Sequence, residues 1–160
     1  MKKFTLLFVF LSVFGFAQMP NISSVWLNKN AAYQGTIGQG SDSEKLSVFI
    51  AISEQDKQKD QEYFISGTTQ VQKFVSNFEG KLKITKYKDS RSQSTVYGEF
   101  DLAEDPASTH AGTIVGKFIY TFKWNRKNQS VEKQFIQFSG VWKSYDGKES
   151  YRVSFSNNTL

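Results

Sequence analysis

The sequence predicts an all-β protein, an eight-stranded antiparallel up-and-down (meander) barrel. Three observations lead to this prediction. Apolar and polar residues alternate with a period of two in one segment after another. The breaks between these segments are short and contain glycine, asparagine or charged residues. After the first 17 residues, no window keeps a helical period over three turns. A chain of 160 residues has the length of one domain.

Residues 1–17 have the three parts of a secretory signal peptide. The start is basic, residues 4–16 form an apolar run, and Gly15 and Ala17 occupy the small-residue positions of a cleavage site before Gln18. The run of about 13 residues is shorter than the roughly 20 that a membrane-spanning helix needs. We therefore expect an exported protein, periplasmic or extracellular. The alternative is that the apolar run forms a buried core helix.

The remaining chain divides into two parts. Residues 18–31 form an N-terminal segment in which Trp26 is a candidate lid that plugs one barrel end, or simply packs there. Residues 32–160 form a single β-barrel domain. Its strands are expected near 32–38, 45–53, 62–71, 74–86, 94–102, 111–123, 133–143 and 149–156.

Two of the breaks carry specific expectations. Residues 54–61 contain no apolar residue and are predicted to be a solvated hairpin loop, with a short charged helix as the alternative. Asp146-Gly147 is predicted to be the centre of a two-residue type I′ hairpin turn. Short connections of this kind favour a meander, and closing the sheet removes its edges. A two-sheet β-sandwich is the alternative.

The barrel is expected to have an apolar interior and a charged outer face, because a lipid-facing exterior could not hold so many charges. The protein should therefore be soluble. Glycines on the inner face would allow sharp coiling or leave room for a ligand; they are Gly35, Gly67, Gly80, Gly98, Gly112, Gly116 and Gly140. The inward set is Tyr33, Ile37, Leu46, Val48, Ile50, Ile52, Tyr63, Ile65, Val71, Phe74, Phe78, Leu82, Ile84, Val96, Phe100, Leu102, Ile114, Phe118, Tyr120, Phe122, Ile136, Phe138, Trp142, Tyr151, Val153 and Phe155.

The chain resembles the calycin group, which comprises lipocalins, fatty-acid-binding proteins and avidins. An aromatic residue precedes a glycine by one or two places in several strands, as at Phe78-Glu79-Gly80 and Tyr97-Gly98. Trp26-Leu27-Asn28 is similar to the Trp-x-Asn at the start of avidin-like chains. The chain also resembles small exported bacterial β-barrel proteins. The resemblance implies the barrel fold and transfers no binding residue.

Composition argues against most chemistry. The chain has no cysteine, one histidine and a net charge of only +5 without a basic, aromatic-rich cluster. We therefore expect no enzyme, no metal, no cofactor and no nucleic-acid partner. His110 follows Asp101, Glu104 and Asp105, so a carboxylate–histidine pair or a weak metal site is one reading, and a solvated loop is the favoured one.

Two functional hypotheses remain. The first is a carrier or scavenger that binds a small apolar or aromatic molecule inside the barrel, where a few polar groups orient it. Its candidate residues are Tyr33, Tyr63, Thr69, Tyr120, Gln134, Trp142 and Tyr151. The alternative is a solid barrel that acts through its outer surface, as an envelope protein–protein interaction module or inhibitor. A candidate outer patch consists of Phe49, Phe64, Val115, Ile119 and Phe135. No particular protein partner follows from the sequence.

Overall fold

The computed structural model describes residues 19–28, 31–90, 93–108, 110–125, 127–128 and 130–157. The expected signal peptide, residues 1–17, lies outside the described residues. A short helix is followed by eight strands, and a 3-10 turn, η1 (Gly40–Asp42), lies between the first two strands. The elements are α1 (Ser23–Trp26), β1 (Tyr33–Ile37), β2 (Glu44–Gln55), β3 (Glu62–Val71), β4 (Phe74–Lys88), β5 (Ser94–Glu104), β6 (Gly112–Asn125), β7 (Ser130–Ser144) and β8 (Ser150–Ser156).

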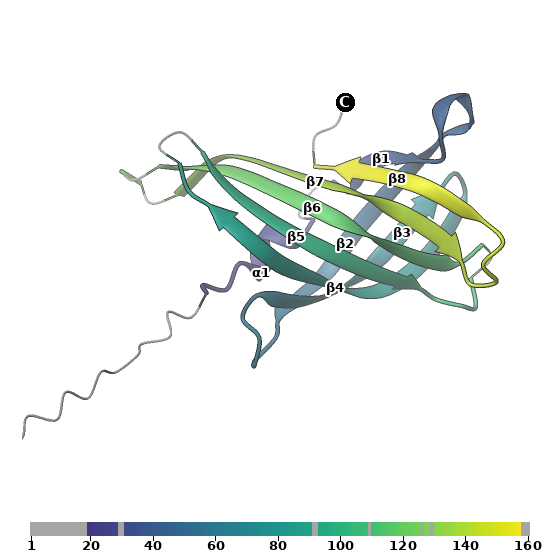
Figure 1. The fold of residues 1–160 in the computed structure, drawn as a ribbon, viewed down its shortest axis with the longest axis horizontal. Helices are drawn as coiled ribbons and strands as arrows, with labels where there is room; N and C mark the ends of the chain where they lie inside the picture. Colours follow the sequence, from purple (N-terminus) through teal and green to yellow (C-terminus); the bar gives the residue numbers. More distant parts are fainter. Residues whose placement is uncertain are drawn as a thin grey trace, which may run out of the picture.

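The strands form one closed barrel in sequence order (Figure 1). Each strand pairs antiparallel with the next, and β8 pairs with β1 from Gln34–Ser156 to Ile37–Val153. This last pairing confirms the meander barrel and excludes the sandwich. No helix among the described residues has the length and the apolar character to cross a membrane.

The ends of β1 and β8 are extended by asparagine side chains. β1 has 5 residues and β8 has 7, whereas β4 and β7 have 15 each. Before β1, the backbone N–H of Asn28 donates to the Ile50 carbonyl (3.2 Å), and the side-chain Oδ1 of Asn28 accepts from the Ile50 N–H (2.7 Å). After β8, Asn157 makes the same two bonds to Ile136, at 3.1 and 2.9 Å. Each asparagine satisfies the backbone of a long strand where its short neighbour ends.

The interior is rich in aromatic rings that contact one another edge to face or, as Phe138 and Phe155 do, by stacking. Phe138 lies in the middle of this core, with ring centres 5.4 Å from Tyr33, 5.3 Å from Phe100 and 4.7 Å from Phe155. Such pairs contribute about 0.5–1.5 kcal/mol beyond the burial of their area. This ring cluster fills the middle of the barrel.

Most of the predicted inward set is buried, and the exceptions have local causes. Ile52 is 49% exposed because the β2–β3 register shifts between Ile50 and Ile52, which reverses the alternation of side chains after the shift. Phe74 and Tyr151 are partly exposed because they lie at an open end of the barrel. Ile37, Val71 and Phe122 are partly buried and pack against the core.

The inner glycines give space to neighbouring rings and strands. A Cβ at Gly98 would lie 2.2 Å from Cζ of Phe118, and one at Gly116 would lie 2.8 Å from Cε1 of Phe100. Both positions therefore exclude any side chain, since rings from adjacent strands occupy the volume. The interpretation of these two glycines as empty space is wrong.

The predicted loop over residues 54–61 is confirmed as a turn between β2 and β3, without a helix. The predicted two-residue turn at Asp146-Gly147 is wrong. Pairing ends with the Ser144 N–H donating to the Glu149 carbonyl, and in this turn only Gly147 has a positive φ, of 72°. Asp146 Oδ1 instead accepts bonds from the Ser144 hydroxyl and the Lys148 N–H, so its side chain closes a longer turn.

The candidate outer patch does not form one surface. Phe49 and Phe64 lie on β2 and β3, whereas Val115, Ile119 and Phe135 lie on β6 and β7. These pairs of strands are separated by β4 and β5 on one side and by β8 and β1 on the other. Val115 is 54% exposed and directly opposes the exposed Val141, so β6 and β7 carry an apolar pair on the outer face.

Candidate functional site

A cavity of about 510 Å³ opens at one end of the barrel. This end carries the connections β1–β2, β3–β4, β5–β6 and β7–β8, and α1 lies toward the opposite end (Figure 1). The residues that line the cavity come from all eight strands. The apolar and aromatic ones among them are Ile37, Leu46, Val71, Phe74, Ile114, Trp142 and Tyr151. Trp142 and Tyr151 are stacked, with ring centres 5.7 Å apart, so they form a flat aromatic wall.

A buried carboxylate lies in this cavity. Glu104 is only 6% exposed, although it ends β5 and lines the cavity. Its Oε2 accepts the Gly112 N–H (3.0 Å) and the Trp142 indole N–H (2.9 Å), and its Oε1 accepts the Thr69 hydroxyl. Three donors from β3, β6 and β7 therefore hold one carboxylate group, and these hydrogen bonds offset part of the cost of burying it.

The surroundings of Glu104 are acidic. Three further carboxylates, those of Asp42, Glu44 and Glu149, line the cavity, and none of the lysines and arginines that the structure describes does so. Tyr145 donates its hydroxyl to the Glu104 carbonyl. Partial burial, together with the charges of Glu104 and nearby aspartates, raises the pKa of the Tyr145 hydroxyl, as a negative potential would.

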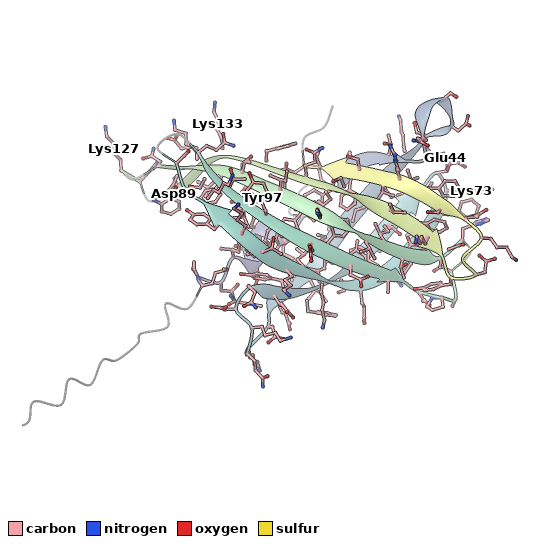
Figure 2. The ribbon with its side chains drawn as sticks, viewed as in Figure 1. Glu44, Lys73, Asp89, Tyr97, Lys127 and Lys133 are labelled. Atoms are coloured by element: carbon pink, nitrogen blue, oxygen red, sulfur yellow. The ribbon has the colours of Figure 1, made fainter. Side chains whose placement is uncertain are left out.

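The β3–β4 turn and His110 form the aromatic rim. The Phe74 ring contacts His110 edge to face at 5.2 Å, and Lys73 Nζ lies 5.6 Å from the centre of the Phe74 ring. Lys73 and Glu44 project at this end in Figure 2, while Asp89, Lys127 and Lys133 project at the other. His110 lines the cavity with a positive φ of 60°. Among the described residues, no group of His, Asp and Glu side chains could hold a metal ion.

The sequence-predicted ligand residues separate into two groups and one outlier. Thr69, Trp142 and Tyr151 line the cavity. Tyr33, Tyr63 and Tyr120 are buried toward the α1 end, away from the cavity walls. The exception is Gln134, which is exposed and accepts a bond of 3.5 Å from the Tyr120 hydroxyl.

Trp26 fills the end of the barrel opposite the cavity. Its side chain is 0% exposed, and its ring centre lies 5.9 Å from Tyr63, 5.1 Å from Phe118 and 5.8 Å from Tyr120. The Tyr33 hydroxyl donates to the Trp26 carbonyl at 3.0 Å. Trp26 therefore plugs this end as part of the core, and it is not among the residues that line the cavity at the other end.

Burial raises the pKa of the three tyrosines around this plug. The pKa of Tyr120 rises to about 12, and burial raises that of Tyr33 further, with a smaller contribution from the nearby Tyr120 hydroxyl. Burial also raises the pKa of Tyr63, despite the bonds that its hydroxyl accepts from Ile22 and Gln55. These phenols stay neutral under ordinary conditions and act as packing groups with a polar tip.

Sequence reasoning named Glu104 only as a possible partner of His110 and did not include it among the candidate ligand-binding residues. The signal was present in the alternation of β5, where Val96, Phe100 and Leu102 face inward and Glu104 follows in the same phase. A charged residue in an inward phase marks either a paired buried group or a ligand site.

The comparisons with known proteins assign no family. No protein-family model, no curated protein and no solved structure matches this chain. The closed barrel of eight antiparallel strands is compatible with a calycin-like architecture.

Proposed function

We propose that this protein binds a small molecule with an apolar or aromatic body in the cavity at the open end of the barrel. The observation that carries the proposal is a cavity of about 510 Å³ with a stacked aromatic wall and one buried carboxylate. Ligand pockets usually have about 300–1,000 Å³, apolar walls and a few placed polar groups. All three properties are present together.

The role follows from this site and from the N-terminal segment. A protein that is exported by cleavage after residue 17 and that holds a ligand would act as a carrier or scavenger outside the cytoplasm. As part of this proposal, we assign the barrel to the calycin-like type. Intact-mass analysis of the protein secreted by its own host tests the export, because a mature chain should begin at Gln18. A secreted chain that still carries residues 1–17 would contradict cleavage at this position.

Ligand binding is tested with a neutral aromatic dye, N-phenyl-1-naphthylamine, whose fluorescence rises in apolar sites. We expect the wild-type protein to bind it and Val71→Trp to lose most of the binding, since Val71 lines the cavity and the larger ring fills it. Gln70→Trp is the matched control, because Gln70 is the neighbouring exposed residue on the same strand. Equal dye binding by both variants would place the dye elsewhere and contradict the proposal.

A complementary measurement identifies a natural ligand. Native mass spectrometry of the protein purified from its own host should detect a bound small molecule that Val71→Trp does not retain. A protein that carries no molecule and also takes up no dye would sink the carrier hypothesis.

Action through the outer surface remains the second candidate. It is supported by the exposed Val115–Val141 pair between β6 and β7. A pull-down from envelope extract should then return a partner that Val115→Lys loses. The absence of a reproducible partner would count against this candidate.

A further inference from the structure

We infer that the ligand of the cavity is an organic cation, a protonated amine attached to an aromatic or apolar body. The inference rests on the proposed function and names the ligand class of the same site. It comes from the charge of Glu104, the absence of lysine and arginine from the described wall residues, and the aromatic faces beside the carboxylate.

The first step is the charge balance at Glu104. All three of its described side-chain bonds come from neutral donors, namely the Thr69 hydroxyl, the Gly112 N–H and the Trp142 indole. The ion pairs found among the described residues do not include Glu104. A buried carboxylate is costly unless a positive charge compensates it. A ligand ammonium in the cavity would supply that charge.

The second step is the number of oxygen sites that remain open. Oε2 already accepts two bonds, whereas Oε1 accepts one, from Thr69. A carboxylate offers about four lone-pair sites. At Oε1 a further donor from the ligand can therefore bind without displacing a protein contact. An ammonium group carries both the donor and the charge that this position lacks.

The third step concerns the walls. The Trp142–Tyr151 stack lines the cavity that holds Glu104, and aromatic faces attract cations. The rim adds the carboxylates of Asp42, Glu44 and Glu149. Lys73, the basic group over the rim residue Phe74, is exposed and can turn into solvent. An anionic ligand would meet four carboxylates here, and among the described wall residues only His110 is basic.

Glu104→Gln removes the charge with little disturbance of the hydrogen bonds. The glutamine Oε1 can take the place of the oxygen that accepts from Gly112 and Trp142. Its NH₂ can then donate to the Thr69 hydroxyl, which can donate onward to the Ser76 carbonyl, 3.4 Å away. Glu99→Gln is the matched control, since Glu99 lies on the same strand but faces outward between Lys83 and Lys117.

The probes are three molecules of similar shape and different charge: 2-phenylethylamine, 2-phenylethanol and 3-phenylpropionate. Isothermal titration calorimetry at neutral pH should show that the cationic amine binds about tenfold or more tightly than the alcohol, as expected for a charge-assisted bond. The anion should bind more weakly than the alcohol. Glu104→Gln should remove most of the preference for the amine, and Glu99→Gln should keep it.

The outcomes separate the ligand class from the site itself. Equal or tighter binding of the alcohol or the anion by the wild-type protein would overturn the cation inference, and so would a preference that persists in folded Glu104→Gln. If Glu104→Gln does not fold, the wild-type protein is titrated at raised salt concentration instead. Salt should then weaken the binding of the amine and leave the binding of the alcohol unchanged. Failure of the amine to bind at millimolar concentration also overturns the inference. The proposed function then stands or falls separately, on dye binding that Val71→Trp blocks.

Discussion

The two ends of the barrel use similar residues for different purposes. At the α1 end, Trp26 from the N-terminal segment fills the interior between Tyr63, Phe118 and Tyr120. At the other end, Trp142 and Tyr151 stack along the wall and leave a cavity of about 510 Å³. Aromatic content alone therefore does not decide whether a barrel is solid. In this barrel, the end that is filled is the one whose interior a segment of the chain enters.

The two ends also differ in how their polar groups are arranged. Each tyrosine hydroxyl at the filled end makes one or two hydrogen bonds of its own, such as that from Tyr33 to the Trp26 carbonyl. At the open end, a single carboxylate collects donors from three strands. The first arrangement is that of a core with polar tips, whereas the second holds a charged group in position for a partner.

The largest expected effect is at the plug. Trp26→Ala should lower the free energy of unfolding by about 3–5 kcal/mol, because it removes a fully buried ring from three aromatic contacts. Urea unfolding followed by circular dichroism measures the loss. Trp124→Ala is the matched control, since Trp124 is 49% exposed and its loss should stay within about 0.5 kcal/mol. Similar losses in the two variants would show that Trp26 is not a core residue.

At the open end, Glu104→Ala should cost about 1–3 kcal/mol in urea unfolding. The substitution leaves the Trp142 indole and the Gly112 N–H without their acceptor. Glu104→Gln should cost much less, because it can keep both bonds. A loss of stability in Glu104→Gln as large as that in Glu104→Ala would indicate that the glutamine does not keep the hydrogen bonds to Gly112 and Trp142.

Removal of the hydrogen bond that anchors the N-terminal segment to β2 should have a smaller effect on stability. Asn28→Ala should cost about 1 kcal/mol, because Ile50 loses the side-chain acceptor of its N–H. Asn28→Asp keeps an oxygen acceptor and should retain most of the stability. Hydrogen exchange at the Ile50 amide should speed up in the alanine variant only. Unchanged exchange would mean that this bond does not protect the strand.

The smallest effect at neutral pH, and a distinct one in alkali, is expected at Tyr120. Burial raises its pKa to about 12, against an ordinary value near 10. The unfolded chain ionises first, so the stability contributed by the neutral phenol is complete below pH 10 and falls as the pH rises from 10 to 12. Tyr120→Phe should therefore lose less stability than the wild type between pH 7 and pH 11, as measured by urea midpoints. Parallel losses would contradict a buried phenol at this position.

The sequence predicts much of this fold, for a physical reason. Successive side chains of a strand point to opposite faces of the sheet, so a strand with one buried face has apolar residues at every second position. In β4, Phe78, Leu82 and Ile84 all face inward in this way. The register shift near Ile52 escapes prediction, since Ile50, Ala51 and Ile52 are all apolar and the pattern does not show which one is extra.

The site is harder to predict than the strands. Thr69, Trp142 and Tyr151 reach the cavity, but the alternation that places them inside treats Tyr33 and Tyr63 in the same way. Which inward rings line a cavity depends on their height along the barrel and on the plug. Neither quantity is local in sequence.

The most direct test of the two-ended barrel uses its three tryptophans, of which one lies in the plug, one on the surface and one in the cavity. Their indole N–H signals can be assigned in a ¹H–¹⁵N spectrum with Trp124→Phe and Trp142→Phe variants. Titration with 2-phenylethylamine should shift the Trp142 signal and leave those of Trp26 and Trp124 in place. A Trp142 signal that stays fixed while the Trp26 signal moves would put the ligand in the end described here as filled, and would contradict the account.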